Sequence, residues 1–451
     1  MCRRQLVARK AANLGESVAL MRHGFRVVDL FCGAGGLSEG FRQAGYSVVA
    51  ASDSDPDACA TYALNFPEAR LLRGDIRSPA VRKKVLAAAG DAEIVVGGPP
   101  CQAFSQVRNH SRLIDDHRNS LYREFVRIVA RMEPLAFVME NVPGLEQMGV
   151  KEQVLEDLSL KGAYRVSVQA LDAADFGVPQ TRRRIFFIGI HAAAELDPPR
   201  MSGLGATAAF SLQRHVRGSK IRYEVAQRES LFHSIDQLED PRNVTAVTAE
   251  QAIGDLAFLT PGERREEISV RELLAPKSGY QRQMRSGLGA TITNVSVPRI
   301  NADTRMRLSK LPAGGNVHDL PESMTDRYLS GELWGPSNGT GKLGRRHYYA
   351  YRRLHPGIWS WTLNTKADSV YHYEALRALS VREFARLQSF PDRFVFSTDL
   401  KRGVLQGRIE GGAAHSKYRQ VGNAVPPLLA KAIASALYKV LTSKVSERVA
   451  A

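Results

Sequence analysis

One cysteine, Cys101, lies in the stretch GGPPCQAFSQ (residues 97–106), directly after the apolar run AEIVV. A cysteine thiolate is a nucleophile, and nearby positive charge or a helix N-terminus lowers the pKa of the thiol. The two prolines before Cys101 remove two backbone donors and stiffen the loop. An isolated cysteine is more often a small buried hydrophobic residue. The position of Cys101 after a strand, at the sheet edge that also holds glycine-rich and acidic strand ends, favours a nucleophile.

The stretch DLFCGAGGLSEG places glycines where a first strand turns into a helix, which lets the backbone approach a ligand closely. The dinucleotide fingerprint G-x-G-x-x-G fails here because Ser38 takes the third glycine position. The remaining G-x-G-G is also how many S-adenosylmethionine sites begin. Asp53 and Asp75 end the next two strands, where carboxylates can reach ribose hydroxyls and an adenine amino group. Each feature alone could be a tight turn or a helix cap, but together they predict a site for an adenosine-containing cofactor.

Two further groups follow later strands. Glu140 ends the apolar run in FVMENVPGL, and a buried, unpaired carboxylate has a raised pKa, which suits a proton donor to a bound base. In QTRRRIFFIG, Arg182 and Arg184 point to the same side of a strand and could clamp a phosphate or a base carbonyl. The alternatives are a solvated glutamate in a loop and a solubilising edge-strand cluster.

The elements that must position these residues alternate between strands and helices. The hydrophobic pattern predicts strands over 26–31, 46–53, 71–76, 92–98 and 134–141, with helices over 37–45, 56–66 and 121–132. Such alternation predicts an α/β fold, a doubly wound and mostly parallel sheet that binds ligands beyond the carboxyl ends of its strands. From 191 to 370 the pattern becomes irregular and loop-like, which predicts a second domain. Helical periodicity returns over 380–390 and 426–441.

The composition is that of a globular protein, with 451 residues of which 44% are hydrophobic and 24% charged. The formal net charge of +16 favours a polyanionic partner such as nucleic acid, the alternative being a solvated basic surface. Four cysteines, all within the first 101 residues and without zinc-ligand spacing, indicate a reducing compartment without a disulfide framework. We find neither a signal sequence nor an apolar run near the ~18 residues of a membrane span, so we expect a cytoplasmic protein.

Taken in order, these segments resemble the DNA (cytosine-5) methyltransferase family of bacterial restriction-modification systems. The matching stretches cover about 27–189 and 378–435 and read DLFCGAGGLSEGF, SDSDPDACATYALNFPE, GDI, GGPPCQAFS, ENVPGL, QTRRRIFFIG, REFARLQSFPD and RQVGNAVPP.

The resemblance implies a Rossmann-like methyltransferase fold and a covalent mechanism without a metal. Cys101 would attack carbon 6 of a cytosine flipped out of duplex DNA, and carbon 5 would take the methyl group of S-adenosyl-L-methionine, leaving S-adenosyl-L-homocysteine. Glu140 would hydrogen-bond ring nitrogen 3 and the amino group, Arg184 would touch the base, and Arg182 would support the site. The remaining residues implied by the resemblance are Phe31, Gly33, Ala34, Gly36, Asp53, Ser54, Asp75, Pro100 and Asn423 for the cofactor, and Gln102, Ser105, Asn141 and Gln180 for the substrate.

The same resemblance divides the chain. We expect a basic N-terminal extension over 1–26, a catalytic and cofactor-binding domain over 27–190, a target-recognition domain over 191–370, a return segment over 371–442 that completes the cofactor pocket, and a tail over 443–451. Two departures stand out. Ser54 follows Asp53 where many relatives carry a bulkier residue that packs on adenine, and Tyr373 stands where proline usually follows the histidine.

The expected partner is double-stranded DNA, bound by a monomer without membrane association, with a cognate restriction endonuclease acting separately. A transfer-RNA cytosine-5 methyltransferase of the same family is one alternative, against which the long recognition segment argues. A non-catalytic DNA-binding regulator is another, against which the intact Cys101, Glu140 and Arg184 argue.

Overall fold

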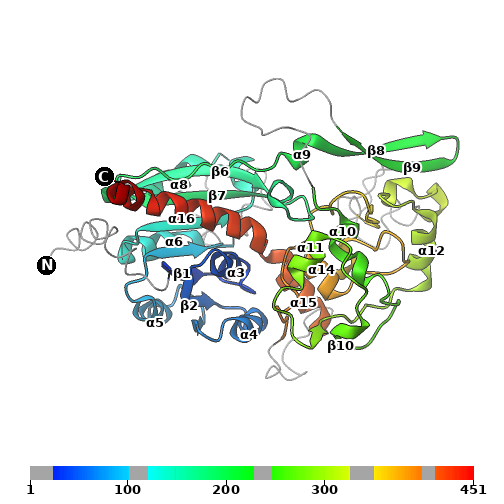
Figure 1. Cartoon of the computed structure of the whole chain (residues 1–451), viewed down its shortest axis with the longest axis horizontal. Helices are drawn as coiled ribbons and strands as arrows, with labels where there is room; N and C mark the ends of the chain where they lie inside the picture. The colour runs from blue at the N-terminus through cyan, green and yellow to red at the C-terminus, as the bar shows by residue number, and fades with distance from the viewer. Residues whose placement is uncertain are drawn as a thin grey trace.

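The structure is a computed structural model that describes residues 24–100, 120–147, 149–227, 246–325, 350–398 and 412–450. Two lobes lie side by side (Figure 1). The sheet lobe holds a seven-stranded sheet, its flanking helices and the C-terminal helix. The second lobe holds residues 246–325, 350–398 and 412–423, and a two-stranded hairpin extends along its upper side in the figure.

The sheet of the first lobe has the order β3-β2-β1-β4-β5-β7-β6. Strands β1 to β5 pair in parallel, whereas β7 runs antiparallel to both β5 and β6. The predicted α/β fold with a mostly parallel sheet is therefore confirmed. The strands are β1 (Arg26–Leu30), β2 (Ser47–Asp53), β3 (Arg70–Arg73), β4 (Ile94–Gly97), β5 (Ala136–Asn141), β6 (Tyr164–Asp172) and β7 (Arg183–His191).

Helices cover both faces of this sheet, which is why its central strands are continuous apolar runs rather than alternating ones. Two hydrophobic clusters show the layers: α3 and α16 pack on one face, and α5, α6 and α8 pack on the other. The helices are α3 (Gly36–Gln43), α4 (Pro56–Asn65), α5 (Pro79–Ala89), α6 (Ser120–Met132), α7 (Gly144–Gln147), α8 (Lys151–Ser159) and α16 (Pro427–Ala450).

The C-terminal helix α16 returns to the sheet lobe and packs along α3 (Figure 1). It continues to Ala450, past the expected end at 441, so the expected tail over 443–451 is helical as far as the structure describes it. The stretch His415–Ser443 is long and apolar enough to cross a membrane, yet 56% of its apolar window is buried inside the protein, as in a core helix.

Regular structure is short outside the sheet lobe, as the irregular pattern of 191–370 predicts. Three hydrophobic clusters lie in the described part of this region, and the largest includes residues from both sides of position 370 as well as Cys32, Tyr62 and Phe66 of the sheet lobe. The elements are α9 (Ala206–Ala209), the hairpin β8 (Phe210–Arg217) and β9 (Lys220–Gln227), α10 (Ala249–Ile253), β10 (Glu267–Ser269), α11 (Gly279–Met284), β11 (Thr291–Thr293), α12 (Ala302–Lys310), α14 (Val381–Leu387) and α15 (Gly412–Asn423).

Candidate active site

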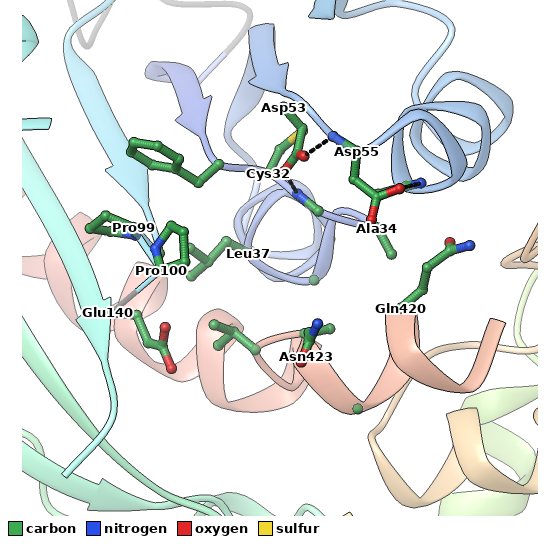
Figure 2. Close-up of a pocket in the computed structure, with 18 of the residues that line it drawn as sticks. Cys32, Ala34, Leu37, Asp53, Asp55, Pro99, Pro100, Glu140, Gln420 and Asn423 are labelled. Carbon is green, nitrogen blue, oxygen red and sulfur yellow. Dashed lines mark hydrogen bonds between the residues drawn. The ribbon is translucent and has the colours of Figure 1, made fainter. Parts of the chain in front are cut away.

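A cavity of about 680 Å³ opens at the carboxyl ends of β1, β2, β4 and β5, where it is closed from the other side by residues 362–365 and by α15. Figure 2 shows the sheet-lobe residues facing Gln420 and Asn423 of α15 across this space. The predicted site residues that line it are Phe31, Gly33, Ala34, Gly36, Asp53, Ser54, Asp75, Pro100, Glu140, Asn141, Arg182, Arg184 and Asn423. The predicted Cys101, Gln102 and Ser105 lie outside the described residues.

The glycine turn between β1 and α3 has a backbone that other residues could not adopt. Gly35 has φ 98°, and a Cβ built there would lie 2.4 Å from the Phe66 ring. A Cβ on Gly36 would lie 2.1 Å from the carbonyl oxygen of Val425, which lies just before α16. Only a glycine at position 36 therefore lets the chain before α16 approach α3 this closely. The amide of Gly33 points to β2 and donates to Asp53 Oδ2 at 2.8 Å.

The acidic residues at the ends of β2 and β3 differ in their partners. Asp53 accepts from the backbone of Gly33 and of Asp55, both at 2.8 Å and on different oxygens, and burial raises the pKa of its carboxyl. A third backbone hydrogen bond, from Ser54, also acts on this carboxylate, so three backbone amides hold Asp53 in place at the cavity. Asp75 instead forms a two-pronged ion pair with Arg77, whose hydrogen bonds lower the pKa of Asp75. Both carboxylates border the cavity, but only that of Asp75 is engaged by a cation at the surface.

Glu140 and Arg184 meet at the other end of the cavity. Arg184 Nε lies 2.9 Å from Glu140 Oε1, and each side chain keeps 14% of its surface exposed. Burial raises the pKa of Glu140, while the positive charges of Arg184 and Arg182 oppose that rise. The pairing of β5 with β7 brings the two together, because Asn141 faces Ile185 across the ladder.

Arg182 lies just before β7 and lines the same cavity, as the alternation of side chains in a strand predicts. Its guanidinium donates to the carbonyl oxygens of Gly422 at 2.7 Å and Leu363 at 3.3 Å, and so joins β7 to the second lobe. Burial and the neighbouring Arg184 lower its pKa well below the usual range. Its Nε has no partner among the described residues.

The two predicted amides have different surroundings. Asn141 lines the cavity, and its Nδ2 lies 3.5 Å from the carbonyl oxygen of Pro99, next to the loop that leads to Cys101. Gln180 is fully buried, does not line the cavity and uses its amide to bind Leu363, Leu387 and Gln388. The structure therefore places Gln180 in the contact between the segment before β7 and the second lobe, outside the lining of the cavity.

The sequence reasoning did not single out several residues that line the cavity. Among them is segment 362–365, which comes shortly after a β-bridge between Gln180 and Ser360. Another is Arg419, which forms an ion pair with Asp55. Gln420 is 5% exposed, and its Oε1 has no partner among the described residues. The motif RQVGN contains two of these residues, but the sequence alone does not tell which side chains of a helix face a cavity.

Comparisons with known proteins agree on one family. A family model described as C-5 cytosine-specific DNA methylase matches residues 25–439. The Type II methyltransferase M.AgeI of Thalassovita gelatinovora is 32% identical, over 91% of this chain and 99% of that protein. The Type II methyltransferase M1.HphI of Haemophilus parahaemolyticus is 31% identical, over 92% of this chain and 87% of that protein. A crystal structure of a prophage-encoded E. coli protein matches with a TM-score of 0.63 at 24% identity, over 93% of this chain and 100% of that one, and shows the same fold.

Proposed function

The chain belongs to the C-5 cytosine-specific DNA methylase family, and from that premise we propose how its cavity performs the reaction. The protein is a DNA (cytosine-5-)-methyltransferase that uses S-adenosylmethionine. One observation carries the assignment of the reaction to this cavity. The Glu140–Arg184 pair lies at the same sheet edge as the glycine turn and Asp53, in a single space large enough for a cofactor and a base.

The residues at the ends of β1 to β3 fit S-adenosylmethionine, which supplies the electrophilic methyl group when bound. The Cβ position of Gly33 has no atom within 4 Å, so the backbone of the turn is open to a ligand. The Asp53 carboxylate at the end of β2 suits the ribose hydroxyls, and Asp75 suits the adenine amino group. Ser54 is exposed and too small to stack on a base, which matches its departure from the family pattern. Asn423 would close the pocket from α15.

The acidic end of the cavity suits the cytosine. Attack of the Cys101 thiolate on carbon 6 moves an electron pair toward ring nitrogen 3, where the raised pKa of Glu140 favours the protonated form that can donate to this nitrogen. Carbon 5 then takes the methyl group, a base removes the proton of carbon 5, and elimination frees the Cys101 thiolate. Pro99 and Pro100 line the cavity, and Cys101 is the next residue in the chain, which supports its role.

The two arginines would have separate roles. Arg184 contacts the Glu140 carboxylate and borders the cavity, so it can orient this carboxyl and bind the carbonyl oxygen of the base. Arg182 is a positioning residue, because its two terminal nitrogens are bound to carbonyl oxygens of the second lobe.

We propose double-stranded DNA as the substrate, with the target cytosine flipped into the cavity and the sequence read by residues 191–370. The net charge of +16 supports binding to the phosphate backbone. The relatives named as Type II methyltransferases support a role in a restriction-modification system. We propose that the enzyme acts there as a cytoplasmic monomer, separately from a cognate endonuclease.

Methyl transfer from labelled S-adenosylmethionine to duplex DNA and to transfer RNA tests the substrate. We expect label in DNA and none in transfer RNA, whereas label in transfer RNA alone would favour the RNA-modifying alternative. The Cys101→Ser variant is the matched control and should show no turnover. Near-normal methylation by that variant would show that the nucleophile is assigned wrongly.

A further inference from the structure

Gln420 is a buried polar side chain of the cavity that the mechanism above does not use. It projects from α15, lines the cavity and is 5% exposed. Figure 2 shows it at the opposite end of the cavity from Pro99, Pro100 and Glu140. Gln420 is therefore remote from the cytosine and faces the part of the cavity that the cofactor would occupy.

The orientation of the Gln420 amide is fixed by its surroundings. Its Nε2 donates to the carbonyl oxygen of Ser397 at 2.8 Å. Ser397 is held in turn by Thr61 of α4, whose Oγ1 accepts from the Ser397 amide at 2.8 Å. Rotating the amide by 180° would place two oxygens against each other, so the oxygen must be the atom that faces away from Ser397.

The Oε1 atom of Gln420 is thus an acceptor without a donor. It has no partner among the described residues, and a buried acceptor without a hydrogen bond is unfavourable. A ligand that brings an N–H or O–H to this position would satisfy it. S-adenosylmethionine carries three kinds of donor: the adenine amino group, the ribose hydroxyls and the α-ammonium group of its amino-acid end.

We propose that Gln420 binds the α-ammonium group of S-adenosylmethionine through Oε1. This inference rests on the proposed function, in which Asp75 and Asp53 bind the adenine and the ribose and leave the ammonium without an acceptor. A hydrogen bond to a charged donor is stronger than a neutral one, so this contact would contribute measurably to cofactor affinity. Gln420 is then a further cofactor-binding residue, which fixes the amino-acid end while Glu140 acts at the base.

Calorimetric titration with three ligands tests the proposal. The ligands are S-adenosylhomocysteine, its analogue that lacks only the α-amino group, and 5′-methylthioadenosine, which lacks the whole amino-acid end. In Gln420→Leu we expect the affinity for S-adenosylhomocysteine to fall about tenfold or more, since a hydrogen bond to a charged group is lost. The affinities for the other two ligands should change less than twofold. Gln43→Leu on α3, outside the cavity lining, is the matched control and should leave all three unchanged.

An equal loss of affinity for all three ligands, or no loss for S-adenosylhomocysteine, would overturn the proposal. If Gln420→Leu does not fold, Gln420→Glu keeps acceptor oxygens at this position and should retain the preference of the wild type for S-adenosylhomocysteine over the deaminated analogue. Loss of that preference in Gln420→Glu would equally contradict the proposal. Failure of the proposed function would look different, because the wild type itself would then bind none of the three ligands.

Discussion

Two groups of buried charges, one in each lobe, are built differently. In the second lobe, Arg386 lies between Asp255 and Asp392, and all three side chains are fully buried. Arg386 makes hydrogen bonds of 2.7 Å to both carboxylates and one of 2.9 Å to the carbonyl oxygen of Ala252. In the sheet lobe, Glu140 and Arg184 share one contact and both remain partly exposed to the cavity.

The difference separates charges that hold the fold from charges that are kept for a ligand. A buried ion pair is tolerated when hydrogen bonds satisfy it on all sides, and removing one partner leaves an uncompensated charge. A charged group with a shifted pKa and spare hydrogen-bonding capacity at a cavity is typical of a functional site. Changing Arg386 should therefore affect stability, whereas changing Glu140 should affect chemistry.

The largest expected effect is that of Glu140→Gln on turnover. The amide can occupy the same space but cannot give a proton to ring nitrogen 3, and loss of a general acid costs about 10²- to 10⁴-fold in rate. We expect kcat to fall by about three orders of magnitude, with little change in melting temperature. Steady-state methylation and thermal unfolding measure both quantities. A large fall in the melting temperature of Glu140→Gln with a near-normal kcat would mean that Glu140 stabilises the fold and does not take part in the chemistry.

The next largest effect is expected for Arg386→Met, which should lower the stability of the protein and leave kcat nearly unchanged. It removes the cation that Asp255 and Asp392 share. Asp255 keeps its ion pair with Arg285, whereas Asp392 loses its hydrogen-bonded cation, so we expect a cost of about 3 kcal/mol in the free energy of unfolding. Urea denaturation measures this loss, and the kcat of the protein that remains folded should stay within about threefold of the wild type. An unchanged free energy of unfolding together with a large fall in kcat would contradict the structural role of Arg386.

Asp29 extends the comparison to a buried carboxyl beside the glycine turn that forms no ion pair with a cation among the described residues. Ser38 donates to one oxygen at 2.7 Å, and the other oxygen has no partner among the described residues. Burial raises the pKa of Asp29 to about 7. A raised carboxyl pKa means that the folded protein holds a proton that the unfolded chain releases above about pH 4, so this stabilisation is complete below pH 4 and lost as the pH rises to about 7.

We therefore expect the wild type to lose about 2 to 3 kcal/mol between pH 5 and pH 8 relative to Asp29→Asn, which has no such proton. Urea denaturation at both pH values measures the difference. The two proteins are compared by how much the free energy of unfolding changes between the two pH values. Their absolute stabilities are not compared, because the asparagine amide changes the hydrogen bonds at this position. Parallel pH profiles of the two proteins would show that Asp29 is ionised in the folded state.

The smallest expected effect comes from Arg77→Ala at the surface. Both residues of the Asp75–Arg77 pair are about half exposed, and exposed ion pairs contribute about 1 kcal/mol at most. Removing Arg77 frees the Asp75 carboxylate, so S-adenosylhomocysteine should bind up to about fivefold more tightly in a calorimetric titration. Weaker binding by tenfold would mean that Arg77 itself contacts the cofactor.

The sequence predicted the parts of the fold whose pattern is local. The strands β1, β2, β4 and β5 and the helix α3 follow from short apolar runs and glycines, so the residues at those strand ends could be placed at one sheet edge. Contacts between distant segments could not be predicted. Asp255 and Arg386 are 131 residues apart, and no periodicity links them.

Because contacts between distant segments could not be predicted, the sequence also did not show which of two glutamines lines the cavity. Gln180 is part of a motif that suggested substrate contact, but its amide is buried against Leu387 and Gln388. Gln420 is part of the RQVGN motif and was not singled out, although it lines the cavity. Which of them meets a ligand depends on how the second lobe packs on β7 and α4, which is a property of the tertiary structure.

The central claim is that Cys101, the residue that follows the cavity-lining Pro99 and Pro100 in the chain, forms a covalent bond to cytosine. A long duplex in which 5-fluorocytosine replaces cytosine tests it directly, since the fluorine at carbon 5 cannot leave as a proton does and the adduct persists. With S-adenosylmethionine present, we predict a protein–DNA complex that survives denaturing electrophoresis, and none with Cys101→Ser. Absence of this complex from the wild type, or its persistence in Cys101→Ser, would contradict the account.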